Sequence, residues 1–245
     1  DHGRNHIEKT YKRPFKDRIL RDFLSKALSK SINFRIVAIL TRFAKPFKYF
    51  FPTKIREMIS FMPTKFPRTT LPSREVYPAE NRKKPIARVA LLVGCVQKVI
   101  SPQINEATIR LLNRHGIEVI VPKKIDCCGS LNHHLGKSDL AKKNFIKNIS
   151  IWYDEYLNNG LDAIISNTSG CGTTLKDYGF IFRSDNNLKK KAKKISELTK
   201  DITEYLYEKV KLNFVTKSKN EKIYKEQLNK ISIDSFRKIR CEFTH

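Results

Sequence analysis

Two adjacent cysteines followed at once by a glycine are the residues of this chain best suited to chemistry. Cys127, Cys128 and Gly129 lie in the stretch KIDCCGSLNHHLG, and Cys95 and Cys171 flank it at a distance. The chain has an odd number of cysteines, five, and no recognisable export signal in its first residues. Disulfides are uncommon in reducing compartments, where clustered cysteines are more often metal ligands or reactive thiols. The cysteines therefore indicate a metal or thiol centre.

Short apolar segments that alternate with helical patterns predict an α/β fold with a parallel sheet. The three strand-like segments are ARVALLVG (87–94), IEVIVP (117–122) and LDAIISN (161–167). Between them, residues 103–116 and 138–160 carry apolar side chains at helical spacing, and we expect Ser138 to cap the second helix. Strand, helix, strand, helix, strand is the order typical of a parallel α/β sheet.

The strand pattern turns four scattered cysteines into one predicted cluster. Cys95 follows the first strand, the Cys127–Cys128 pair follows the second, and Cys171 follows the third. Carboxyl ends of parallel strands share one edge of the sheet, so the four thiols should converge. Four thiolates suit an iron–sulfur cluster or a structural zinc ion, and the spacing C-x31-CC-x42-C lacks the paired knuckles of zinc ribbons. The alternative is that these cysteines only fill core space.

Glycines and a histidine accompany the predicted centre. Gly94, Gly129, Gly170 and Gly172 flank the cysteines, and we expect their backbone N–H groups to donate to cluster sulfurs and tune the potential. Gly129 should also relieve crowding beside the cysteine pair. His134 could hydrogen-bond a cluster ligand or help a proton to move, and a surface or capping role is the alternative.

The remaining residues divide the chain into further regions. We expect a helical region (1–62), a Pro-rich linker (63–86), the cysteine-rich α/β domain (87–185), a C-terminal helix (186–212) and a basic tail, helical or disordered (213–245). The fold class is thus α/β, a parallel sheet with flanking helices between a helical region and a basic tail. The basic amphipathic helices at 15–61 could rest on an anionic membrane, form a helical core, or dock a partner.

The net charge of +25, from 49 Lys and Arg against 24 Asp and Glu, has two interpretations. It could indicate a nucleic-acid or anionic-membrane binder, or it could reflect the Lys, Asn and Ile usage of an AT-rich genome. The basic residues are spread along the chain and no nucleic-acid motif accompanies them, so nucleic acid is not the favoured partner. No run of about 20 uncharged apolar residues is present.

The cysteine segments together resemble a known domain family. The motifs are Gly94-Cys95-Val96-Gln97, Cys127-Cys128-Gly129 followed by His134, and the stretch SGCGTTLKDYG from Ser169. They resemble the cysteine-rich CCG domain of heterodisulfide reductase subunits and of the iron–sulfur subunit of glycolate oxidase (glycolate dehydrogenase), with the glycolate branch more similar. The segments IEKTYKRPFKDRILR and ISELTKDITEYL extend the resemblance over about residues 1–210.

This resemblance implies an iron–sulfur cofactor and an electron-transfer role. The implied ligands are Cys95, Cys127, Cys128 and Cys171, with Gly94, Gly129, Gly172 and His134 around them, and [4Fe–4S] is the candidate cluster. Electrons would come from a flavin-containing partner subunit that oxidises glycolate or a similar 2-hydroxy acid such as D-lactate, and would pass to a membrane acceptor. Hydride chemistry belongs to the partner, so no catalytic residue is expected here. The expected location is the cytoplasm, at the inner face of the membrane, with peripheral membrane association.

Two departures from the family pattern bear on this interpretation. Thr174 stands where the heterodisulfide reductase pattern has a second cysteine, and no ferredoxin-type C-x2-C-x2-C-x3-C-P run occurs. The chain also begins at Asp1. We therefore expect a fragment that lacks the ferredoxin region and a second CCG domain. The alternatives are a vestigial or structural CCG domain without redox activity, or a basic nucleic-acid-binding protein.

Several other residues near the motifs have alternative interpretations. Lys176 and Tyr178 could neutralise a cluster or contact a quinone-like acceptor, with packing and surface roles as the alternative. Asp126 is expected to be a turn residue, and Trp152 is expected in the core. Cys241, in the basic tail, is expected to be incidental.

Overall fold

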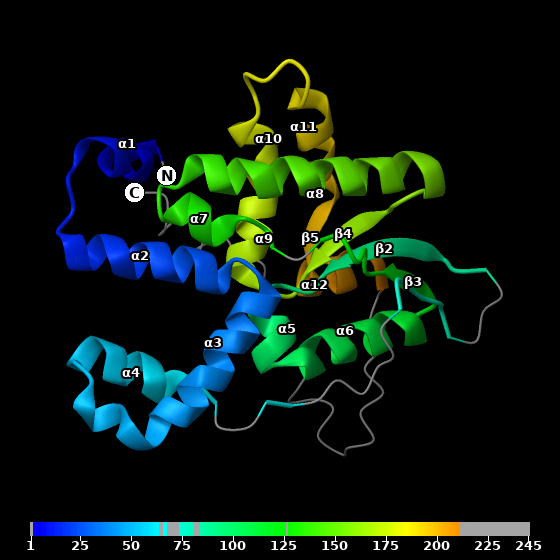
Figure 1. Cartoon of the computed structure of the whole chain (residues 1–245). Helices are drawn as coiled ribbons and strands as arrows, with labels where there is room; N and C mark the ends of the chain where they lie inside the picture. Colours follow the sequence, from blue (N-terminus) through cyan, green and yellow to red (C-terminus); the bar gives the residue numbers. More distant parts are fainter. Residues whose placement is uncertain (1, 64–65, 68–73, 81–83, 126, 211–245) are drawn as a thin grey trace, which may run out of the picture. The chain divides into compact units, whose positions relative to one another are not determined.

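The computed structural model describes residues 2–63, 66–67, 74–80, 84–125 and 127–210 (Figure 1). The helices are α1 (His2–Thr10), α2 (Phe15–Leu28), α3 (Ser31–Ala44), η1 (Lys45–Phe50), α4 (Thr53–Phe61), α5 (Gln97–Ile100), α6 (Pro102–Arg114), α7 (Ser130–His134), α8 (Ser138–Asn159), α9 (Ser169–Lys176), α10 (Tyr178–Ile181), α11 (Lys189–Leu198), α12 (Ile202–Tyr205) and η2 (Leu206–Val210). The strands are β1 (Val76–Tyr77), β2 (Ala87–Leu92), β3 (Ile117–Ile120), β4 (Ala163–Ser166) and β5 (Thr199–Asp201).

The strands form one mostly parallel sheet in the order β1-β3-β2-β4-β5. The three strands expected from the sequence, β2, β3 and β4, are parallel neighbours, with Val89 opposite both Val119 and Ala163. β5 continues the sheet in parallel beside β4, whereas the two-residue β1 pairs antiparallel with β3. The predicted α/β class with a parallel sheet and flanking helices is confirmed.

Alternation along the strands gives the sheet two apolar faces. Ala90 and Leu92 of β2 lie in a buried cluster with Phe145, Ile149 and Trp152 of α8. Val89 and Leu91 point to the other face, where α6 contacts β3. Figure 1 shows α8 and α6 on opposite sides of the strands. Because both faces are covered, the strands consist of continuous apolar runs. Trp152 is fully buried, as expected for a core residue.

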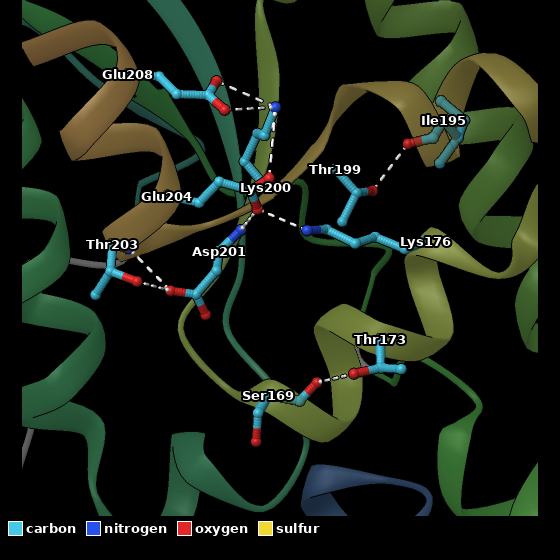
Figure 2. Close-up of polar contacts among 10 residues, drawn as sticks. All are labelled: Ser169, Thr173, Lys176, Ile195, Thr199, Lys200, Asp201, Thr203, Glu204 and Glu208. Atoms are coloured by element: carbon cyan, nitrogen blue, oxygen red, sulfur yellow. Dashed lines mark hydrogen bonds and ion pairs between the residues drawn. The ribbon is translucent and has the colours of Figure 1, made fainter. Parts of the chain in front are cut away.

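Two expected features differ from the structure because of longer-range contacts. The expected single helix over 186–212 is broken by β5, since Thr199–Asp201 pair with β4 and Asp201 caps α12. The D-x-x-E signature of a capping box was present at Asp201 and Glu204, and Figure 2 shows the contacts of both residues. Helix α8 is not capped by Ser138, which is its first helical residue; Lys137 occupies the cap position without a side-chain hydrogen bond.

Residues 1–210 form one compact unit. The amphipathic helices expected at 15–61 are present as α2, α3, η1 and α4. The predicted boundaries at 62, 86 and 185 stay predictions, and the basic tail (213–245) lies outside the described residues. Within the part of the chain that the structure describes, no helix is long and apolar enough to cross a membrane.

Candidate metal centre

The cysteines lie on three loops at the carboxyl edge of the sheet. β2 is flanked by β3 on one side and β4 on the other. Cys95 lies in the turn after β2, the Cys127–Cys128 pair lies between β3 and α7, and Cys171 lies in the first turn of α9 after β4. The chain crosses from one side of β2 to the other between β3 and β4. This edge is therefore a topological switch point, where α/β proteins place ligand sites.

The four sulfurs approach one another in two close pairs. The Sγ atoms of Cys95 and Cys127 are 3.8 Å apart, and those of Cys128 and Cys171 are 3.0 Å apart. None of the four forms a disulfide, and all four line one open pocket of about 300 Å³, here called the cysteine pocket. The predicted convergence of the cysteines is thus observed, although Cys241 lies outside the described residues.

The spacing of the sulfurs can be compared with the geometry of a metal–thiolate centre. With metal–sulfur bonds of about 2.3 Å, two ligands of a tetrahedral metal lie about 3.8 Å apart, which is the Cys95–Cys127 separation. Cys128 and Cys171 would need to separate by about 0.8 Å to reach the same spacing. Among the described residues, no group of three or more His, Cys, Asp or Glu side chains surrounds a single-ion position. Paired thiols at this spacing are compatible with a centre in which two thiolates share one iron, and a cluster with one thiolate on each iron requires the sulfurs to lie further apart.

The pKa of each of two thiols depends on the neighbouring cysteines. Hydrogen bonds with Cys127 and Cys171, followed by burial, raise the pKa of the Cys128 thiol well above its usual value. The hydrogen bond donated by Cys128 lowers the pKa of Cys171, and this outweighs the opposing effect of burial. Cys171 is therefore the member of this pair that ionises first and is ready to act as a thiolate ligand.

Backbone N–H groups after the cysteine pair donate to two of the sulfurs. The N–H of Gly129 lies 3.3 Å from Cys127 Sγ, and the N–H of Ser130 lies 3.5 Å from Cys128 Sγ. Gly129 has φ +85°, and an added Cβ would meet Phe145 Cε1 at 2.5 Å. Only glycine can therefore hold this turn, which directs two donors at the sulfurs.

The other flanking glycines have different contacts. Gly94 lines the cysteine pocket with φ +66°. The N–H of Gly172, expected at a sulfur, instead donates to the carbonyl of Thr168 at 2.9 Å, because Gly172 lies inside α9. An added Cβ at Gly172 would lie 3.3 Å from Ser166, so this glycine permits close packing of α9 on β4.

A buried polar pair fixes the backbone of the vicinal cysteines. The hydroxyl of Tyr178 donates to the carbonyl of Cys128 at 2.6 Å, and Asn148 Nδ2 donates to the carbonyl of Cys127 at 2.9 Å. Asn148 also donates to the Tyr178 hydroxyl at 3.2 Å. Tyr178 is fully buried, so it cannot contact an external acceptor and has the packing role that was the alternative; its hydrogen bond to Cys128 was not predicted. The DYG stretch was noted, but nothing local identifies a partner 50 residues away.

A second polar network joins the loops of Cys95 and Cys171. Gln97 Nε2 donates to Asn105 at 3.1 Å and to Asn167 at 3.0 Å, and Thr168 donates to Gln97. Asn105 in turn donates to the carbonyl of Val93 at 2.8 Å. Gln97 was part of the recognised motif, whereas Asn105 and Asn167 carried no sequence signal. The network holds two cysteine loops in a fixed relation.

Helix α2 covers one side of the cysteine pocket. The thiol of Cys95 donates to the carbonyl of Leu28 at 3.0 Å, and Leu28 lines the pocket. Arg21 donates to the carbonyl of Leu135 at 2.7 Å, and Ser25 donates to the buried Asn132 at 2.6 Å. The helical region is thus part of the site.

His134 and Lys176 are placed differently with respect to the pocket. His134 lines it, and partial burial followed by the charge of Arg4 lowers its pKa. Lys176 does not line the pocket; its Nζ lies 2.6 Å from Glu204 on the surface (Figure 2). Asp126 lies outside the described residues. Of His134 and Lys176, only His134 adjoins the cysteines.

Comparison with known families agrees with this geometry. Residues 89–176 match the model of the cysteine-rich domain called CCG. The matched segment runs from β2 to the end of α9 and contains all four converging cysteines. No solved structure matches the chain.

Proteins similar to this chain carry iron–sulfur and lactate-utilization names. The chain is 33% identical to the glycolate oxidase iron-sulfur subunit of Escherichia coli (strain K12) over 85% of its own length and 47% of that protein. It is 31% identical to the probable glycolate oxidase iron-sulfur subunit of Bacillus subtilis (strain 168), over 49% of the chain and 26% of that protein. It is 29% identical to lactate utilization protein A of the same strain, over 49% of the chain and 48% of that protein. The predicted resemblance is confirmed, and the chain spans half or less of the length of these relatives.

Proposed function

We propose that this chain holds an iron–sulfur cluster in the cysteine pocket and passes electrons within a 2-hydroxy-acid oxidoreductase. The observation that carries the proposal is the convergence of four cysteine side chains from three strand ends on one pocket. The relatives named as iron–sulfur subunits support the choice of cofactor. The relatives named for glycolate and lactate support the substrate class.

The residues of the pocket have separate tasks in this proposal. Cys95, Cys127, Cys128 and Cys171 would be the ligands of a cluster, with [4Fe–4S] as the candidate, which when bound would accept and release single electrons. The N–H groups of Gly129 and Ser130 stabilise negative charge on the sulfurs, and such hydrogen bonds raise the reduction potential. Leu28 and the rest of α2 restrict the access of water on one side of the pocket.

Electron flow would require partners that this chain does not supply. We propose that a flavin-containing subunit removes the hydride from glycolate, D-lactate or a similar 2-hydroxy acid. The electrons would then pass through the iron–sulfur protein to a membrane acceptor at the cytoplasmic face. Under this proposal the residues of the present chain take part in electron transfer alone.

The cluster is tested by metal content. The whole chain is purified without oxygen or reconstituted with iron and sulfide, and iron, sulfide and absorbance near 400 nm are measured. We expect Cys128→Ser to lower the iron content strongly, because it removes a thiol that interacts with both Cys127 and Cys171. Cys241→Ser is the matched control and should keep the content of the unmodified chain. A colourless wild-type preparation without iron and sulfide, or equal loss in both variants, would contradict the proposal.

We further propose that an apolar surface of the helical region rests on an anionic membrane. Helix α3 buries Phe34 and Ala38 on one side. Its opposite side exposes Ile32, Ile36, Ile39, Leu40 and Phe43, here called the outer stripe of α3. These five residues recur at helical spacing, so they form one continuous face. A helix that is apolar on both sides normally has both sides covered.

The outer stripe continues into aromatic side chains that are even more exposed. Phe50 is 88% exposed and Phe61 is 89% exposed, and Phe47 and Tyr49 accompany them. Residues 31–61 contain six Lys or Arg against one Glu. Exposed aromatic and aliphatic groups mixed with basic residues are typical of surfaces that lie in the interface of anionic lipids. Charge complementarity therefore favours a lipid surface over a second basic chain of this kind.

Vesicle binding tests this membrane surface. We expect the whole chain to sediment with phosphatidylglycerol vesicles more than with phosphatidylcholine vesicles, and Leu40→Ser with Phe43→Ser to weaken the binding. The matched control is Leu157→Ser with Phe180→Ser, since these residues have comparable exposure on α8 and α10. No binding to either vesicle, or equal loss in the control, would show that protein covers the outer stripe of α3 instead.

A further inference from the structure

A second pocket, next to the cysteines but distinct from the cysteine pocket, has an unusual set of lining residues. It has a volume of about 430 Å³ and is lined by Lys30, Lys98, Lys123, Lys124, Lys147 and Cys127, among others. We call it the lysine pocket. Five of its eleven lining residues are Lys, whereas Lys and Arg together make up 49 of 245 residues in the chain. The basic composition of the chain alone therefore does not account for this lining.

The lysines come from four separate segments that the fold brings together. Lys30 precedes α3, Lys98 lies on α5, Lys123 and Lys124 follow β3, and Lys147 lies on α8. Among the residues that the structure describes, none that lines the pocket is acidic. Across the residues that the structure describes, Lys123 has an exposed ion pair with Glu75 at 3.8 Å, and the other four lysines have no ion pair. A cleft lined by one sign of charge concentrates counter-ions.

Other groups at the rim suit an oxyanion. Lys30, Ser31 and Ile32 line the pocket and are the cap and the first two residues of α3, a 14-residue helix. The first N–H groups of a helix have no partner within it and favour negative charge. Ser29 adds a hydroxyl and Asn144 adds an amide to the same lining.

We propose that the lysine pocket binds a phosphate group. Lysine ammonium groups act as point charges that can approach an anion from several directions, which suits a tetrahedral phosphate with its several acceptor oxygens. A planar carboxylate is matched best by the fork of Arg, and no Arg lines the pocket. The volume lies within the range of small-molecule sites and leaves room for an organic group attached to the phosphate.

The phosphate could belong to a soluble compound or to a lipid headgroup, and the chemistry at the lysines is the same. Ile32 belongs both to this lining and to the outer stripe of α3, which places the pocket beside the proposed membrane surface. The binding itself does not depend on the electron-transfer proposal, because it requires neither iron nor a flavin partner.

Calorimetric titration of the whole chain with inorganic phosphate and with pyrophosphate, at constant ionic strength with chloride as the competing anion, tests the pocket. We expect saturable binding of one ligand per chain. Lys98→Ala with Lys147→Ala should weaken it at least tenfold, because each lysine supplies a charge-assisted hydrogen bond. The matched control is Lys189→Ala with Lys190→Ala on α11, which should change the affinity less than twofold. Circular dichroism verifies that each variant is folded.

A second pair, Lys30→Ala with Lys124→Ala, should reproduce the loss if the first pair fails to fold. The absence of saturable phosphate binding, equal weakening in the α11 control, or equally tight binding of succinate would each overturn the phosphate assignment. Phosphatidylglycerol vesicles distinguish the sources. If pocket lysines are needed for vesicle binding and free phosphate competes, the natural ligand is a lipid headgroup. If vesicle binding ignores these lysines while phosphate binding requires them, the ligand is soluble.

Discussion

Gly129→Ala is the substitution whose cost follows most directly from the geometry of the centre. Gly129 has φ +85°, a backbone conformation that costs a residue with a Cβ about 1–2 kcal/mol. The added Cβ would lie 2.5 Å from Phe145 Cε1, 2.8 Å from Cδ1 and 3.2 Å from the carbonyl of Ala141. Phe145 is fully buried against the ring of Tyr178, with ring centroids 4.7 Å apart. Its ring therefore cannot move aside without repacking the core.

Overpacking of this kind adds about 1–3 kcal/mol, so the expected loss in the free energy of unfolding is about 2–5 kcal/mol. At roughly 2–4 °C per kcal/mol for a chain of this size, the melting temperature should fall by about 4–20 °C. Urea unfolding followed by circular dichroism measures the free energy, and a thermal scan measures the melting temperature.

Gly160→Ala is the matched control. Gly160 has φ +72°, and an added Cβ there would have no atom within 4 Å. Its ψ of 132° lies outside the left-handed helical region, so the substitution should cost only the backbone strain of a conformation that favours glycine, about 1–3 kcal/mol, without a steric clash. Equal destabilisation by the two substitutions would refute the argument, because it would show that Phe145 yields freely and that the contact with the cysteine turn does not constrain it.

Three further substitutions test separate parts of the structure. Tyr178→Phe removes the hydroxyl that donates to the Cys128 carbonyl at 2.6 Å and should lower the free energy of unfolding by about 1–3 kcal/mol in urea titration; an unchanged midpoint would contradict this bracing role. Burial and then the charge of Asp162 raise the pKa of Tyr205 to about 12, whereas the phenol titrates near 10 in the unfolded chain. The contribution of the neutral Tyr205 side chain to the free energy of unfolding is therefore full below pH 10 and is lost as the pH rises from 10 to 12. When the pH is raised from 9 to 12, the free energy of unfolding measured by urea titration should therefore fall less in the Tyr205→Phe variant than in the unmodified chain. An equal fall in both proteins would contradict the raised pKa of Tyr205. Arg88→Met breaks contacts at 2.6 Å and 2.5 Å to carboxylates on β3 and α8 and should cost about 1–3 kcal/mol, whereas a cost near zero would show that solvent screens this network.

The helical region shows why some predictions succeeded only in part. The apolar spacing in FKDRILRDFLSKAL was sufficient to predict α2, because helical periodicity is a local property. The same spacing did not reveal that Arg21 donates to Leu135, 114 residues away. It also did not distinguish the buried side of α3 from its exposed side, since both carry apolar residues at helical intervals.

The C-terminal part shows how tertiary contacts override local propensity. Residues 186–210 have the composition of one basic amphipathic helix, yet Thr199–Asp201 form β5. Pairing with β4 satisfies the backbone of this segment, and the side chain of Asp201 accepts from the N–H of Thr203 at 2.9 Å. Available sheet edges lie far away in the sequence, so a local pattern does not report them.

The sequence by itself determined the strand–helix alternation and the placement of four cysteines after three strands. Apolar runs and glycine turns act over a few residues, and parallel strands necessarily end at one edge. Only the tertiary structure decided that Cys95 pairs with Cys127 and Cys128 with Cys171, that Tyr178 and Asn148 hold the vicinal pair, and that five lysines share a pocket. These arrangements depend on side-chain packing between segments tens of residues apart, where small shifts in helix position change which atoms meet.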